Sequence, residues 1–352
     1  MNLFATVLTY AAPSANYRGE SEENRAVIQK ITSGRFEFPV ISPEAMRNAL
    51  RETLAAYKLP CNRSRLHDEE QLAVRFLDYP DPDKYVDDFF FGYLVAASGA
   101  DRKRILAALK EKKRDEKTFQ FKRDSVLRMN LARGIEPYRN NAVFTQSPLT
   151  SEDSPWRNAT TSALLHRETA LTAFQYPFAL NLDDCSTKPE WTKALLKAIG
   201  ELNDVAGNHA RSYFEMAPAS IVVRLTNQLV AGYGTYGFDS SGDFPEVIKG
   251  VLYGKPLVTP DGSIQKGEEG RIEWERAPDF PGAEFYIGGL IVKHLEAEHD
   301  AAVAESEKKK DKQDHRPKTR LEGLKEFGVT LDRDPRRLLA TIGEKIFPAR
   351  GA

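Results

Sequence analysis

The 352-residue sequence predicts a mixed α+β fold, in which a β-sheet core carries helices and insertions. An apolar run rich in β-forming residues spans 2–11 and has the length of a strand. Apolar residues then alternate over 36–40, and Ser42 as N-cap with Pro43 at the first helical position begins a helix. A second amphipathic helix is predicted over 189–205. Strands and helices therefore follow one another from the start of the chain.

The opening segment, residues 15–57, has the pattern of a polyanion-binding element. We expect a turn, a helix, a strand and a second, capped helix in that order, with backbone amides and Arg18 facing outward in the turn 14–19. In the capped helix, Arg47 and Arg51 are four residues apart and share a face on which they could contact successive phosphates. The alternative is an ordinary core helix with a solvated basic face.

We interpret the rest of the chain as insertions into one core, because the sequence contains no internal repeat. The spacing predicts helices at 69–77, 85–97, 102–114, 189–205, 293–307 and 335–346. It predicts two extended arms around a flexible tip within 118–176, and strands at 210–216, 220–225 and 283–292. The glycine-rich and acidic stretch 238–279 matches no motif.

Charge is balanced over the whole chain but not locally. Lysine and arginine total 50 against 51 acidic residues, so the bulk charge does not indicate a nucleic-acid-binding protein. Residues 102–128 carry a net charge of +7, and Phe119 and Phe121 alternate with basic residues there. Aromatic rings beside cations suit single-stranded RNA, whose bases stack and whose backbone needs positive charge. The alternative is a solvated helix face.

The sequence indicates neither a cofactor nor an enzyme. It has no GxxxxGK[ST] loop for nucleotide phosphates. His294 and His299 are spaced to lie on different faces of a helix, and Asp183 and Asp184 fit a turn after a strand. We therefore expect no catalytic residues, no bound metal and no cofactor.

Cysteine content and hydropathy point to the cytoplasm. Cys61 and Cys185 are too few for a disulfide framework or an unaided zinc site. The apolar run 3–12 is short and follows no basic segment, so a first strand is favoured over a signal peptide. No stretch approaches the length of a membrane span, and no membrane partner is expected.

Six stretches resemble, in the same order along the chain, the DevR-type CRISPR autoregulator family. That family is the RNA-binding backbone subunit of type I Cascade effector complexes, and the resemblance is to an I-B-like system. The stretches are ANYRGESEENRAVIQKI from residue 15, FPVISPEAMRNALRE from 38, DDFFFGYLVAA from 87, KRDSVLRMN from 122, ALTAFQYPFALNLD from 170 and ARSYFEMAPASIVVRLT from 210.

The resemblance implies an RRM-like, ferredoxin-like palm with a helical fingers insertion and a β-hairpin thumb. The implied borders are palm 1–58 and 179–292, fingers 59–117, thumb 118–178, and C-terminal helices with a charged tail 293–352. The sequence has no RNP1 string of the ordinary RRM, so stacking of bases on the sheet is not expected.

The resemblance also implies RNA-contacting residues. The residues that match the family's stretches facing the RNA backbone are Asn16, Tyr17, Arg18, Ser42, Arg47 and Arg51. The residues that match its basic segment entering the thumb are Lys122, Arg123, Arg128 and Arg133. His166 and Arg167 precede the second arm, although a lone histidine is more often structural. Arg211 and Tyr213 lie on a predicted central strand, where core packing of the tyrosine is the alternative.

The function implied is that of a non-catalytic subunit. Several copies would form a helical filament along the CRISPR RNA (crRNA) and hold its hybrid with target DNA. The other implied partners are a small cap subunit at the 5′ end, a large subunit and the crRNA-processing endonuclease. A metal-dependent endoribonuclease using a loop aspartate and a repressor of its own operon are the alternatives. The sequence shows no isolated aspartate in a recognisable loop, as the endoribonuclease would need, and no helix-turn-helix, as the repressor would need.

Overall fold

The computed structural model forms two compact units, Met1–Leu50 with Met129–Ala352, and Arg51–Arg128, which are considered separately. We call them unit 1 and unit 2. The structure describes residues 1–14, 17–22, 25–65, 74–112, 119–146, 164–205, 213–260, 263–267, 270, 272–308 and 318–348. Within these ranges no helix combines the length and apolarity needed to cross a membrane.

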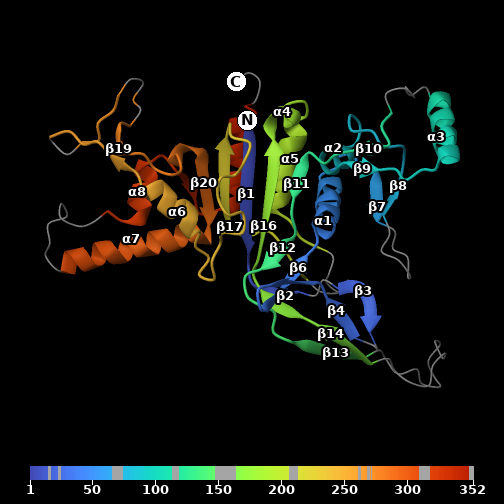
Figure 1. Cartoon of the computed structure of the whole chain (residues 1–352), viewed down its shortest axis with the longest axis horizontal. Helices are drawn as coiled ribbons and strands as arrows, with labels where there is room; N and C mark the ends of the chain where they lie inside the picture. The colour runs from blue at the N-terminus through green and yellow to red at the C-terminus, as the bar shows by residue number, and fades with distance from the viewer. Residues whose placement is uncertain are drawn as a thin grey trace. The chain divides into compact units, whose positions relative to one another are not determined.

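Unit 1 is built on a large mixed sheet (Figure 1), so the predicted α+β class is confirmed at this level. The sheet order is β21 (Thr330–Asp332), β20 (Phe285–Gly289), β17 (Pro218–Thr226), β1 (Asn2–Thr9), β16 (Phe174–Asn181), β12 (Ala132–Gly134), β6 (Phe36–Ile41) and β5 (Lys30–Ser33). The predicted first strand is the central β1, antiparallel to both β16 and β17. Every residue of β17 is buried, as a strand covered on both faces requires.

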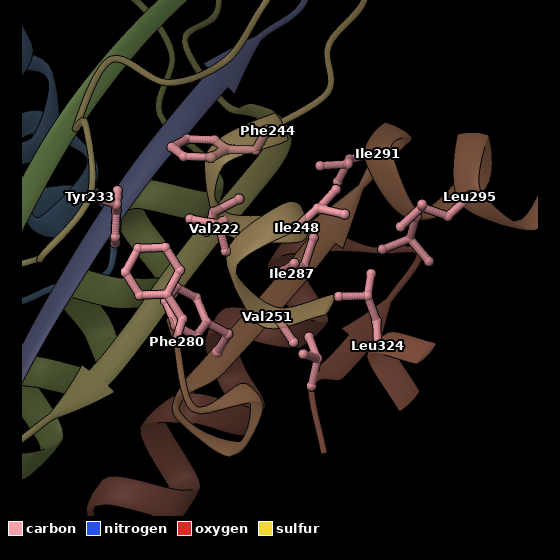
Figure 2. Close-up of a cluster of buried hydrophobic side chains, with 14 of the residues drawn as sticks. Val222, Tyr233, Phe244, Ile248, Val251, Phe280, Ile287, Ile291, Leu295 and Leu324 are labelled. Carbon is pink, nitrogen blue, oxygen red and sulfur yellow. The ribbon is translucent and has the colours of Figure 1, made fainter. Parts of the chain in front are cut away.

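Helices cover this sheet. Helices α5 (Pro189–Gly200) and α9 (Pro335–Ile346) pack on each other, and α9 also contacts β17 and β20. A separate apolar cluster joins the sheet to α6 (Pro245–Leu252), α7 (Leu290–Lys308) and α8 (Arg320–Glu326). Figure 2 shows side chains of this cluster, among them Val222, Phe244 and Leu324, converging between the ribbons. Burying each such side chain contributes about 1.5–3 kcal/mol.

A second, four-stranded sheet forms from two distant stretches of unit 1. Its order is β13 (Ala142–Gln146), β14 (Leu164–Glu168), β4 (Arg25–Ile28) and β3 (Tyr17–Glu22). Two extended segments within 118–176 do pair, as the antiparallel strands β13 and β14, and β14 lies in the predicted second arm. The run 119–127 expected as the first arm is not the partner of β14, and residues 147–163 between the two strands lie outside the described residues. Strand β2 (Ala12–Ser14) pairs with β15 (Ala170–Thr172), which is distant in the sequence.

The first helix predicted within 15–57 is wrong. Strands β3, β4 and β5 occupy the described part of 17–33, and β4 pairs in parallel with β14. The spacing of the short segment was compatible with a helix, but pairing with the distant strand satisfies its backbone groups instead. The following strand and the Ser42-capped helix, α1 (Pro43–Ala56), are confirmed.

Unit 2 contains short elements around the C-terminal part of α1. They are α2 (Val86–Phe91), α3 (Gly99–Glu111), the pair β7 (Arg63–Arg65) with β8 (Val74–Phe76), and the pair β9 (Tyr93–Leu94) with β10 (Lys122–Arg123). Strand β11 (Leu127–Met129) contains the boundary residue of unit 2 and belongs to the large sheet. The helix predicted at 102–114 is confirmed as α3, but the one predicted at 69–77 is wrong where the structure describes it, because β8 lies there. The helix predicted at 85–97 ends at Phe91, since Gly92 adopts a φ of 61°.

Later elements follow the predictions with shifted bounds. The last helix has the predicted span, whereas α5 ends at Gly200 and the strand predicted at 283–292 is limited to β20 because α7 already begins at Leu290. Of the strand predicted at 210–216, the described part makes only the isolated bridge of Glu215 with Asn203. The unmatched stretch 238–279 supplies α6, β18 (Lys255–Pro256) and β19 (Trp274–Arg276).

Candidate nucleic-acid interface

The start of α1 in unit 1 borders an open groove. The Ser42 hydroxyl accepts a hydrogen bond from the Ala45 N–H at 3.2 Å, and Pro43 occupies the first turn, where its missing N–H costs nothing. The free N–H groups of a first helical turn favour negative charge. The groove has a volume of about 640 Å³ and is lined by Gln29, Lys30, Ile31, Glu37, Val40, Ser42, Pro43 and Leu131.

Arg47 lies on the second turn of α1, in the same unit as the groove. Its Nη1 is 3.4 Å from the exposed Glu44 carboxylate, and its Nη2 donates to the Met129 carbonyl at 3.5 Å. Its Nε is buried and has no hydrogen-bond partner among the described residues. An exposed pair of this kind contributes little, so the Arg47 guanidinium is available to an anionic ligand at small cost.

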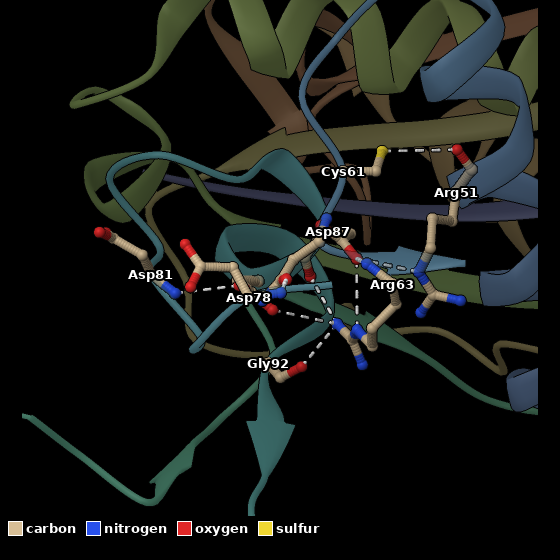
Figure 3. Close-up of polar contacts among 9 residues, drawn as sticks. Arg51, Cys61, Arg63, Asp78, Asp81, Asp87 and Gly92 are labelled. Carbon is tan, nitrogen blue, oxygen red and sulfur yellow. Dashed lines mark hydrogen bonds and ion pairs between the residues drawn. The ribbon is translucent and has the colours of Figure 1, made fainter. Parts of the chain in front are cut away.

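Arg51 was predicted to share that outward face, and this placement is wrong. Its side chain is 7% exposed and its Nε lies 3.1 Å from a carboxylate oxygen of the fully buried Asp87. Arg63 donates to the same oxygen at 3.2 Å, and also to the carbonyls of Asp87 and Gly92 (Figure 3). Burial, followed by the positive charge of Arg63, lowers the pKa of Arg51. Arg51 therefore belongs to the interior of unit 2 and not to an interface.

Arg133 lies on β12 and is held by aromatic rings. The centre of its guanidinium is 5.3 Å from the Phe38 ring and 5.2 Å from the Tyr236 ring. Its Nε is buried without a hydrogen-bond partner within the described ranges. In the sheet register Arg133 pairs with Val40, which lines the groove. The pairing of β12 with β6 thus brings Arg133 beside Ser42, and both are predicted site residues.

Sequence reasoning missed Lys30 and Tyr236. Lys30 lines the groove, where its ammonium is 3.3 Å from the buried Glu168 carboxylate and 4.3 Å from the Tyr138 ring centroid. Tyr236 lies in a glycine-containing stretch that does not contain a phosphate-binding loop. Neither residue stands in a basic cluster, so no local pattern could have identified them.

The small sheet brings together other predicted residues. His166 and Arg167 lie on β14 opposite Arg25 and Ala26 of β4, and Tyr17 and Arg18 lie in β3 of the same sheet. The His166 ring is 4.0 Å from that of Phe144, which is 59% exposed. An exposed aromatic residue beside a histidine offers a stacking surface to an unpaired base. The predicted residues Asn16 and Arg211 lie outside the described residues.

Unit 2 carries the predicted basic and aromatic segment. Lys122 and Arg128 are exposed and lie within 4.0 Å of the Asp124 carboxylate. Arg123 is 5.6 Å from the Phe89 ring, and its buried Nε has no partner in the described part of the chain. Phe121 packs edge-to-face on Phe119 with the ring centroids 5.1 Å apart, and Arg102 covers Phe121 at 4.4 Å. The rings are thus partly occupied by the protein's own cations.

Within the described ranges, no group of three or more histidine, cysteine, aspartate or glutamate side chains is placed to hold a metal ion. His299, one of the two histidines considered from the sequence, has its Nδ1 3.0 Å from the Thr319 hydroxyl. That contact belongs to the start of α8, where Thr319 is the N-cap residue.

One curated protein and two solved chains are similar to this chain over most of its length. No protein-family model matches the chain. It is 26% identical over 313 residues to the "CRISPR-associated protein Cas7/Cst2/DevR" of Myxococcus xanthus (strain DK1622), covering 87% of this chain and 92% of that one. Two solved chains, from a "CRISPR RNA-guided surveillance complex, pre-nicking" and a "CRISPR RNA-guided surveillance complex", are each 11% identical, with TM-scores of 0.49 and 0.46. Each alignment covers 99% of this chain and 100% of the solved one. The curated homologue confirms the resemblance to the DevR family.

Proposed function

We propose that this chain, a homologue of a curated Cas7/Cst2/DevR protein, is a non-catalytic subunit that grips crRNA by its phosphate backbone. The observation that carries the proposal is the pair of arginines in unit 1. Arg47 and Arg133 each have a buried Nε without a hydrogen-bond partner among the described residues, and Arg133 adjoins the groove at the start of α1. Arginine forks and helix N-termini are groups that bind phosphate.

The elements fit the roles that the family resemblance implies. The main sheet of unit 1 would be the RRM-like palm, the four-stranded sheet with β13 and β14 the thumb, and unit 2 the fingers. Copies of the chain would follow one another along the crRNA as a helical filament within a type I Cascade complex. The small cap subunit, the large subunit and the crRNA-processing endonuclease would complete that complex.

A backbone grip leaves the bases free for pairing. Contacts to phosphates set register and affinity but carry no sequence information. In RNA-guided complexes the guide pairs with the target, and the protein recognises shape and charge. We therefore propose that the chain holds the hybrid of crRNA with target DNA without reading either strand.

The test is to purify the full chain from cells that express its own guide RNA and to measure the bound RNA. We expect an RNA band of the length of a spacer with its repeat-derived ends. Arg47→Ala with Arg133→Ala is expected to lower the affinity for single-stranded RNA, and the log–log salt slope by roughly 0.7 for each lost phosphate contact. Lys325→Ala, an exposed residue in the last turn of α8, is the matched control and should change neither.

Protein that purifies without nucleic acid, and that binds neither the guide nor other single-stranded RNA, would contradict the proposal. So would a double variant whose affinity and salt slope equal those of the wild type, because the site would then not be the grip.

A further inference from the structure

The loop between β17 and α6 lies over the main sheet and is firmly attached to it. The Thr6 hydroxyl donates to the Thr235 carbonyl at 3.0 Å. The Gln175 side chain bonds the backbone of Phe238 twice, accepting from its N–H at 3.1 Å and donating to its carbonyl at 3.3 Å. Gln175 is also the register partner of Arg133. The loop 235–238 is therefore held over the sheet face on which Arg133 lies.

Two features fix the position of Tyr236 within this loop: the hydrogen bond of its hydroxyl and the close packing of the next residue. Its hydroxyl donates to the Leu131 carbonyl at 2.7 Å, and Leu131 lines the groove at the start of α1. The next residue, Gly237, lies so close to the Phe244 ring that a side chain there would collide with it. The Tyr236 ring thus has a defined position beside the Arg133 guanidinium, 5.2 Å from its centre.

Arg133 differs from the buried arginines of the chain in what holds it. Arg224 is paired with Glu284 at 2.7 Å and Arg51 with Asp87 at 3.1 Å, so their charges are neutralised within the protein. Arg133 makes no ion pair with a described carboxylate and is held by two rings, Phe38 and Tyr236. Aromatic rings orient a guanidinium without neutralising it or occupying its in-plane donors.

We propose that Tyr236, together with Phe38, positions the Arg133 guanidinium for a phosphodiester of the bound nucleic acid. The inference rests on the proposed function and adds to it a positioning residue from a segment without basic character. Phosphate is the ligand class because a guanidinium fork binds two phosphate oxygens at once, and because the adjacent groove begins at a helix N-terminus. Holding the guanidinium in place before binding removes the entropy cost of ordering a long side chain.

The test is a double-mutant cycle on binding of the full chain to a fluorescent 30-nucleotide oligouridine. We expect Arg133→Ala to weaken binding about tenfold, as for loss of a charged hydrogen bond. Tyr236→Leu should weaken it about threefold, as for loss of a partly exposed cation–π contact, and should have no further effect in the Arg133→Ala background. Tyr236→Phe keeps the ring and should bind nearly as the wild type does.

A matched control is Tyr253→Leu, because Tyr253 forms the same kind of pair with Arg276 at 3.9 Å without lining the groove. It should leave affinity unchanged. Thermal melting of each variant separates a binding effect from unfolding, and Arg133→Lys should not restore affinity because an ammonium lacks the planar fork.

Different outcomes overturn the inference and the proposed function separately. If Arg133→Ala weakens binding but Tyr236→Leu does not, Tyr236 has no positioning role and the phosphate grip remains. If Tyr236→Leu weakens binding equally with and without Arg133, the ring stacks on a base directly and positioning is overturned. If the wild type does not bind the RNA at all, the proposed function itself fails.

Discussion

Two arginines one helical turn apart, Arg47 and Arg51, have different environments. Both lie on α1 and both were expected on one outward face. Arg47 is partly exposed and contacts the exposed carboxylate of Glu44 and the Met129 carbonyl, whereas Arg51 contacts the buried Asp87. Spacing along a helix determines a face but not what packs against it. The role of each arginine therefore depends on residues that are distant in the sequence.

At this residue scale, Asp87→Ala should destabilise unit 2 strongly. The substitution leaves Arg51 and Arg63 without the carboxylate that both contact. Removing one partner of a buried ion pair costs about 3 kcal/mol or more, because the remaining charge stays desolvated. The free energy of unfolding from urea titration measures the loss. Asp101→Ala, which removes an exposed partner of Arg104, is the control and should change it much less.

Because Arg51 belongs to this buried ion-pair network, its substitution should change stability and leave RNA binding unchanged. Arg51→Met should lower stability while the folded fraction keeps its affinity for single-stranded RNA. A loss of affinity equal to that of Arg47→Ala, in protein shown to be folded, would restore Arg51 to the interface and contradict its assignment to the interior.

At the scale of elements, α1 connects the two units, since it spans Pro43–Ala56 and the boundary falls after Leu50. Its N-terminus was recognisable in advance because Ser42 and Pro43 are local signals. Strand β4 was not, because it pairs in parallel with β14, which is distant in the sequence. Elements defined by their own residues could be predicted, and those defined by a distant partner could not.

Substitutions of Ser42, the N-cap of α1, distinguish an effect on stability from an effect on RNA affinity. Ser42→Ala removes the hydrogen bond to the Ala45 N–H and should cost about 1 kcal/mol of stability. Ser42→Asp keeps a cap but places a carboxylate in the groove, so it should retain stability and lose RNA affinity. Thermal melting and RNA titration at two salt concentrations measure the two effects.

Equal affinity of Ser42→Asp and the wild type at low salt would show that phosphates do not approach this end of α1. Ser42→Asn, a neutral cap of similar size to aspartate, is the matched control, and it should preserve both stability and binding.

On the scale of the whole molecule, each unit carries its own candidate phosphate-contacting residues. Arg47 and Arg133 belong to unit 1, and Lys122, Arg123 and Arg128 to unit 2. A chain with 50 basic and 51 acidic residues can bind a polyanion only where cations are gathered locally. The charge of +7 over 102–128 is one such place.

A non-catalytic role predicts that the assembled complex leaves complementary RNA intact. Incubation with a complementary RNA and Mg²⁺ should yield no more cleavage products than incubation with EDTA, as judged by denaturing gel electrophoresis. Regularly spaced cuts that one Asp→Ala substitution abolishes would identify an endoribonuclease instead. A non-complementary RNA of equal length is the control for contaminating nucleases.

The sequence by itself determined the fold class, the first strand, the Ser42-capped helix and the last helix, because their signals are local. It also carried the resemblance to the DevR family, through ordered stretches of residues. Only the tertiary structure decided that Arg51 is internal, that β3 and β4 share a sheet with β13 and β14, and that Phe38 and Tyr236 hold Arg133. The physical reason is that burial, strand pairing and ring contacts join residues far apart in the sequence, and no periodicity records them.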